Sequence, residues 1–210
     1  MRNHHFKEDS MRNILIQGII FFILSFIFIM SVRAAETYTA ENYKIDAKHS
    51  YVLWQISHFG FSEQTGKWYA EGELQLDEKN PQNSKVNAII RLEDMVTGIS
   101  KLDEHLKKED FFDIANYPNA KFISNKIIMT GKDSAKVEGM LTLHGVSKPV
   151  VLNVKLRKVG MSPITNKMTA GFTATAKLKR SDFGMKTYLP GLGDEVKILI
   201  EVEAYKENKK

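Results

Sequence analysis

The chain has 210 residues, and its 30 lysines and arginines outnumber its 25 acidic residues, which gives a formal net charge of +5 at pH 7. It contains no cysteine, which excludes disulfides, thiolate metal sites, a nucleophilic cysteine and the lipidated cysteine of a bacterial lipoprotein. The small positive charge does not amount to the dense basic face that nucleic-acid binding requires, so we expect no nucleic-acid partner.

The N-terminal segment is predicted to be an export signal. Residues 14–30 are almost continuously apolar, they follow Arg12, and the small residues that end at Ala34 suit a signal-peptidase site. We therefore expect a signal peptide over residues 1–34 and one folded domain over residues 35–210, in a periplasmic protein. The apolar run is also close to the length of a membrane span, so an uncleaved anchor stays an alternative, as does secretion.

Apolar and polar residues alternate from Tyr43 onward with the period of two that β-strands show. The first inward-facing rows are Val52, Trp54, Ile56 and His58; then Trp68, Ala70, Gly72, Leu74 and Leu76; then Val86, Ala88, Ile90 and Leu92. Residues 59–66 are expected to join the first two strands as a hairpin-like connection. In this connection Gly60 and Gly66 would supply unusual backbone angles.

The period then changes to that of a helix. Ser100 and Asp103 resemble a capping box, which predicts a short helix over residues 101–108. Phe111 and Phe112 follow it. The sequence leaves two interpretations of this excursion: a hinged aromatic cap over one mouth of a barrel, or a plain plug at the end of the core.

Strands resume near Phe122 and continue to the C-terminal region. The later inward rows are Val137, Gly139, Leu141 and Leu143; Val150, Leu152, Val154 and Leu156; Ala170, Phe172, Ala174, Ala176 and Leu178; and Val196, Ile198, Ile200, Val202 and Ala204. The short connections, one of them a turn at Gly145, suit antiparallel pairing. About eight alternating strands avoid exposed edges by closing on themselves, so we predict an all-β fold, a single eight-stranded antiparallel barrel with one short inserted helix.

Small residues recur on the inward face of this predicted barrel. They are Ala70, Gly72, Ala88, Ser124, Gly139, Ala170, Ala174 and Ala176. An eight-stranded barrel is about wide enough to be filled by side chains or to hold one small ligand. The small residues favour an elongated apolar channel, and the alternative is that Trp54, Trp68 and Phe172 fill the space beside them.

Several short segments together resemble the YceI-like family. They are His49-Ser50, Ser57-His58-Phe59-Gly60, His105-Leu106, Asp110-Phe111-Phe112, Tyr117-Pro118 with Phe122 and Ser124, Leu143-His144-Gly145-Val146, Lys148-Pro149-Val150, Arg180-Ser181-Asp182-Phe183-Gly184 and Asp194-Glu195-Val196. The resemblance implies an exported lipocalin-like barrel that binds polyisoprenoids or other long amphiphilic lipids inside, in lipid or quinone handling or stress resistance. Phe59 stands where leucine is common in the family, and Trp54 is a bulky wall residue that would shorten the channel.

The predicted ligand-binding residues follow from the inward rows. They are Val52, Trp54, Ile56, His58, Trp68, Ala70, Leu74, Leu141, Leu152, Phe172, Ala174, Ala176 and Arg180. Arg180 and Asp182 continue the inward phase of their strand, and buried charges need partners, so we place them at a mouth of the barrel. Arg180 would either contact a lipid head group, helped by Lys148 or Lys186, or form an ion pair with Asp182.

Other chemistry finds little support in the sequence. Asp182-Phe183-Gly184 also occurs in kinase metal-binding loops, but a Gly-rich loop and a catalytic loop are missing, so we predict a turn with Phe183 packed and Gly184 relieving the backbone. The histidines lack metal-site spacing, and His144 is expected at the surface.

We therefore predict no catalytic residue, metal or cofactor, and a role in binding, transport or storage of a polyisoprenoid or similar long-chain amphiphile. The alternatives are a periplasmic enzyme acting on a small isoprenoid-like molecule, with His58 as its candidate group, and a filled barrel acting in a stress response through surface contacts. Membrane contact during ligand exchange and a homodimer both stay open.

Overall fold

The structure is a computed structural model that describes residues 40–207. The predicted export signal lies outside these residues. Within them the chain forms nine strands: β1 (Glu41–Ile45), β2 (Tyr51–His58), β3 (Ser62–Leu76), β4 (Lys85–Arg91), β5 (Asn119–Gly131), β6 (Ser134–Leu143), β7 (Val146–Met161), β8 (Met168–Lys179) and β9 (Leu192–Lys206). The helices are α2 (Ser100–Leu106) and the 3-10 turns η1 (Pro81–Asn83), η2 (Leu92–Asp94) and η3 (Arg180–Phe183). No helix in this range is long and apolar enough to span a membrane.

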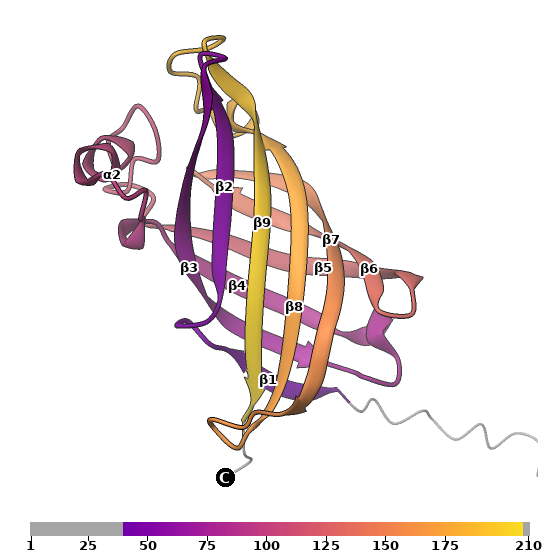
Figure 1. Ribbon diagram of the computed structural model, residues 1–210. Coiled ribbons are helices and arrows are strands. Elements are labelled where there is room, and N and C mark those ends of the chain that lie inside the picture. Colours follow the sequence, from indigo (N-terminus) through magenta and orange to yellow (C-terminus); the bar gives the residue numbers. More distant parts are fainter. Residues whose placement is uncertain (1–39, 208–210) are drawn as a thin grey trace, which may run out of the picture. The chain divides into compact units, whose positions relative to one another are not determined.

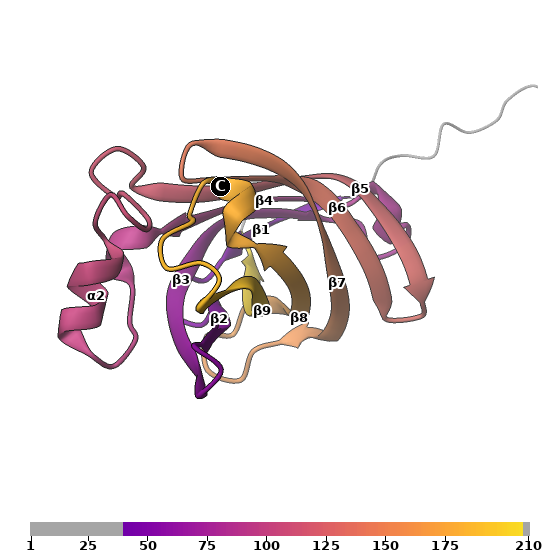
Figure 2. The same cartoon turned by 90° about the horizontal axis from the view of Figure 1, so that it is seen from above.

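All strand pairings are antiparallel, and they close the sheet into a barrel (Figures 1 and 2). The order is β1-β3-β2-β9-β8-β7-β6-β5-β4, and a further pairing of β3 with β4 completes the ring. β1 and β2 occupy the same position between β3 and β9, because β2 pairs with the first half of β3 and β1 with the second half. Nine strands therefore fill eight positions, and the predicted eight-stranded antiparallel barrel is confirmed.

The break between β1 and β2 is held by one buried serine. Ser50 has no exposed surface, and its hydroxyl donates to the carbonyl of Glu203 and accepts from the amide of the same residue, both at 3.1 Å. These two bonds satisfy the backbone groups of β9 that a continuous strand would otherwise pair. The chain can therefore bend at this point without leaving buried polar groups unpaired.

The turn between β2 and β3 is shorter than predicted. Phe59 and Gly60 both have positive φ angles, 52° and 73°, as tight hairpin turns require. Gly66 is not part of this turn: it lies within β3, where a Cβ atom would stand 2.4 Å from the ring of Trp54. Its role is to leave room for that indole ring. The β6–β7 turn does use the predicted Gly145, with φ 73°, after His144 at φ 51°.

The predicted helix is present as α2, but the capping box is wrong. The N-cap residue is Ile99, and no side chain caps the helix. The carboxylate of Asp103 turns back instead to Thr97, from which it accepts the backbone N–H at 2.8 Å and the hydroxyl at 2.6 Å. α2 lies beside β3 at one end of the barrel (Figures 1 and 2).

An apolar cluster lies inside the barrel where β1 meets β9, and it contains a buried tyrosine. Tyr43 is 1% exposed and packs with Ile45, Leu76, Ala170 and Ala204. Burial raises the pKa of the Tyr43 hydroxyl to about 12, and the carboxylates of Glu78 and Glu41 raise it as well. The neutral phenol is therefore the form that the folded state favours.

The raised pKa of Tyr43 predicts that the folded protein loses stability at alkaline pH. The pKa of tyrosine in the unfolded chain is about 10, so between pH 10 and 12 the unfolded state loses its proton first, and the free energy of unfolding falls by about 2–3 kcal/mol. We expect Tyr43→Phe to lack this part of the decline. Urea unfolding of both proteins at pH 9 to 12 measures the difference, and parallel curves would contradict the assignment.

Candidate ligand cavity

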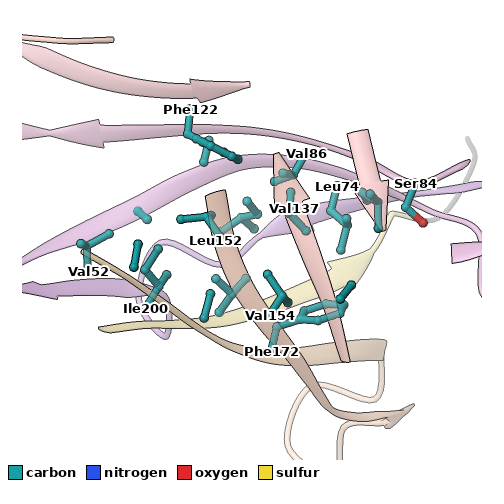
Figure 3. A pocket seen from close by; sticks show the side chains of 18 of the residues that line it. Val52, Leu74, Ser84, Val86, Phe122, Val137, Leu152, Val154, Phe172 and Ile200 are labelled. Atoms are coloured by element: carbon teal, nitrogen blue, oxygen red, sulfur yellow. The ribbon is translucent and has the colours of Figure 1, made fainter. Parts of the chain in front are cut away.

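A cavity of about 510 Å³ lies inside the barrel. Its lining is almost entirely apolar, and it draws on every strand, with aliphatic side chains converging from opposite walls (Figure 3). Of the predicted ligand residues, the following line it: Val52, Trp68, Ala70, Leu74, Leu141, Leu152, Phe172, Ala174 and Ala176. The interior is therefore not filled by its own side chains. Whether these residues contact a ligand stays a prediction.

The small inward residues serve different purposes. Ala70, Ala88, Ala174 and Ala176 line the cavity and contribute its space. The others are Gly72, Ser124, Gly139 and Ala170, and each has a local structural role. At Gly139 a Cβ atom would stand 2.5 Å from the ring of Phe122, and the hydroxyl of Ser124 accepts the amide N–H of Val86 at 2.9 Å. Ala170 packs in the cluster around Tyr43. Gly72 has a φ angle of 140° at the point where β3 changes its pairing partner from β2 to β1.

One end of the cavity is closed by aromatic rings. Val52 lines the space, but Trp54, the next inward residue on β2, does not. The rings of Trp54 and Trp68 lie 6.0 Å apart, and Phe112 meets Trp68 edge-on at 5.1 Å. Trp54, Ile56, Leu106 of α2 and Phe111 are all buried in the same cluster. The excursion after η2 is thus a plug of the core rather than a separate cap.

The opposite end reaches the surface between two connections. The lining there includes Glu78 and Ser84 from the β3–β4 connection and Lys132 and Asp133 from the β5–β6 turn. Glu78, Lys132 and Asp133 are exposed, and they are the ionisable residues of the lining. Both connections lie at the end of the barrel away from α2 (Figure 1). The cavity is therefore apolar inside and polar at its mouth.

A buried aspartate organises this mouth. Asp77 is 1% exposed, and its carboxylate accepts the amides of Lys79 at 3.1 Å and Asn80 at 2.9 Å. Its own amide donates to the Ser84 hydroxyl at 2.9 Å. These bonds fold the connection back on itself, as aspartate does in turns. The rim that Glu78 and Ser84 contribute is consequently fixed by the chain's own hydrogen bonds.

Arg180 follows the end of β8, away from the mouth formed by Glu78 and Lys132, and it does not form the predicted ion pair with Asp182. Its guanidinium is buried, and it donates to the carbonyls of Gly193 at 2.8 Å, Leu192 at 3.0 Å and Met185 at 3.1 Å. Asp182 points to solvent. Burial lowers the pKa of Arg180, and nearby Asp194 counteracts this. The reason for the difference is local: β8 ends at Lys179, and η3 turns Arg180 away from the cavity.

Two histidines also differ from expectation in their surroundings. His58 ends β2 in an exposed position beside the ring of Phe59, away from the cavity. His144 is half-buried, not a free surface residue: its Nδ1 lies 3.0 Å from the carbonyl of Phe183, and Tyr117 packs on its ring. Phe183 is 2% exposed and Gly184 has φ 84°, so the predicted turn at these residues is confirmed.

Trp54, Ile56, His58 and Arg180 are thus the predicted ligand residues that do not line the cavity. The sequence prediction missed other wall residues that belong to the same inward rows. They include Val86, Ile90, Val137, Val154 and Ile200, and Phe122 of β5 lines the cavity as well. Alternation alone was enough to find these. Across residues 40–207, no group of three or more histidines and carboxylates is placed to hold a metal ion.

Comparison with known proteins gives a consistent result. Residues 43–204 match the family model of the YceI-like domain. UPF0312 protein plu2095 of Photorhabdus laumondii is 37% identical over 176 residues, which cover 82% of this chain and 91% of that protein. The crystal structure of a YCEI protein from Campylobacter jejuni is 29% identical, with a TM-score of 0.66, and covers 73% of this chain and 91% of that one. A polyisoprenoid binding domain from Saccharophagus degradans has the same fold, with a TM-score of 0.63 at 15% identity, covering 79% of this chain and 98% of that one.

Proposed function

The chain belongs to the YceI-like domain family, and we propose that it binds a polyisoprenoid or a similar long-chain amphiphile inside its barrel without acting as an enzyme. The single observation that carries the proposal is the apolar cavity of about 510 Å³. The name of the Saccharophagus degradans domain, a polyisoprenoid binding domain, supports the same ligand class.

The apolar interior is sufficient for useful affinity. Burial contributes about 0.8 kcal/mol per CH₂-sized group, so one five-carbon isoprene unit contributes about 3–4 kcal/mol as an upper limit. Micromolar binding needs about 8 kcal/mol, which several buried units exceed even after the costs of association. Polar contacts are then needed for orientation only.

The arrangement of the two ends favours one orientation of the ligand. The hydrocarbon tail would extend toward Trp68, and the polar end would lie among Glu78, Ser84 and Lys132. The ionisable residues of the lining are confined to this mouth, which favours binding over acid–base chemistry deep in the barrel. We also propose transport or storage as the physiological role, in the periplasm after export, with cleavage after Ala34.

Native purification tests the proposal. The full chain is produced with its own leader in a Gram-negative host, purified from the periplasm, extracted with organic solvent and analysed by mass spectrometry. We expect about one prenyl lipid or similar amphiphile per protein, because the apolar walls hold it through purification, and an N-terminus at Ala35. Absence of stoichiometric lipid, together with no binding of prenyl alcohols in solution, would contradict the binding role. An intact N-terminus in the membrane fraction would contradict cleavage after Ala34.

A further inference from the structure

We infer that the barrel encloses a chain of about four isoprene units and that Trp68 is the stop which sets this length; the inference rests on the proposed function and specifies its ligand. The volume gives the length. A cavity of about 150 Å³ holds one benzene molecule, which is about 25 Å³ per carbon atom. By that measure the 510 Å³ of this barrel takes about 20 carbon atoms, the content of four isoprene units.

The position of the stop follows from the strand register. Val52 and Trp68 are direct partners on β2 and β3, and both line the cavity. The next inward pair toward α2 is Trp54 and Gly66, and neither lines it. On β2 and β3 the lining therefore ends within one inward step, at the ring of Trp68, and on β9 it continues to Ile198, the partner of Trp54.

The rings of Trp54 and Phe112 pack against Trp68 and support it. The ring of Trp54 occupies the space that Gly66 leaves by having no side chain. Phe112 packs edge-on against Trp68 at 5.1 Å, and both tryptophans are only 7% exposed. A rigid ring backed by other rings cannot yield to a longer chain as a flexible aliphatic side chain would. Longer prenyl chains must therefore leave their extra units outside the mouth, near Glu78 and Lys132.

A series of prenyl alcohols of two to eight isoprene units tests the inference, by displacement of a fluorescent prenyl probe from the full-length mature protein. We expect the affinity to rise by about tenfold or more with each unit up to the fourth, and by less than about twofold with each later unit. Trp68→Ala removes an indole of about nine ring atoms, enough for nearly two more units at about 25 Å³ per atom, so its affinity should rise up to the sixth unit. Trp68→Leu should extend the rise by about one unit, and it provides the test if the alanine variant does not fold.

Phe61→Ala is the matched control, because Phe61 is an exposed aromatic residue in the turn between β2 and β3 and does not line the cavity. We expect its length limit to stay at four units. A limit that moves equally in Phe61→Ala and Trp68→Ala would overturn the role of Trp68. A wild-type affinity that keeps rising beyond the fifth unit would overturn the length limit itself. Failure of every prenyl alcohol to bind would instead remove the proposed function.

Discussion

Ala174→Trp is expected to weaken the binding of a four-unit prenyl alcohol by at least about 100-fold while the barrel stays folded. Ala174 lies on β8 between Val154 of β7 and Ile200 of β9, and all three residues line the cavity. An indole added here takes the space of about nine carbon atoms, or nearly two isoprene units, from the middle of the channel. Each lost unit removes at least about tenfold in affinity.

The stability of Ala174→Trp distinguishes a barrel with an open channel from one whose interior is filled by side chains. In a close-packed interior, a small-to-large substitution costs about 1–3 kcal/mol through strain. In this barrel the new ring enters existing space, so we expect the free energy of unfolding of the ligand-free protein to change by less than about 1 kcal/mol. Titration with the fluorescent probe and urea unfolding measure the two quantities on one preparation.

Thr175→Trp is the matched control. Thr175 is the next residue of β8, it is exposed, and it does not line the cavity. Its tryptophan should leave lipid affinity unchanged. Wild-type affinity in Ala174→Trp, or equal losses at both positions, would mean that the space inside the barrel is not where the ligand binds.

The barrel itself was predictable because its signal is local. Strands in a closed barrel alternate between inside and outside along their whole length, so Val52, Ala70 and Phe172 could be assigned to the interior from the sequence alone. What alternation does not report is the position of an inward residue along the barrel axis. Trp54 and Ile56 face inward as predicted, but they lie in the plug, because the end of the cavity is set by rings from a distant segment.

The mouth and Arg180 were missed for a different reason. The connections that form the mouth have no periodicity, so residues such as Glu78 and Lys132 carry no signal of their position. Asp77 and the residues after it do have the composition of a turn, but composition does not place a turn over a cavity. The alternation of β8 does not extend to Arg180, because the strand ends at Lys179 and a 3-10 turn reorients the chain there.

Arg180→Met is expected to lower the free energy of unfolding by about 3–5 kcal/mol. Its guanidinium donates to the carbonyl of Met185, in the connection from η3 to β9, and to those of Leu192 and Gly193, the first two residues of β9. Methionine has a comparable length but no donor, so it leaves these carbonyls without their partner, and each buried unsatisfied acceptor costs about 1–3 kcal/mol. Relief from burying the charge offsets part of the loss.

Thermal and urea unfolding measure this effect, and two further variants define its origin. Arg180→Lys keeps the charge but offers a single ammonium group in place of the planar fork, so it should lie between the wild type and Arg180→Met. Asp182→Ala removes the exposed carboxylate of the same turn and should change stability by less than about 0.5 kcal/mol.

Because Arg180 does not line the cavity, folded Arg180→Met should bind a four-unit prenyl alcohol and its phosphate ester with wild-type affinity. Selective loss of the phosphate ester at unchanged stability would show instead that Arg180 acts on a lipid head group.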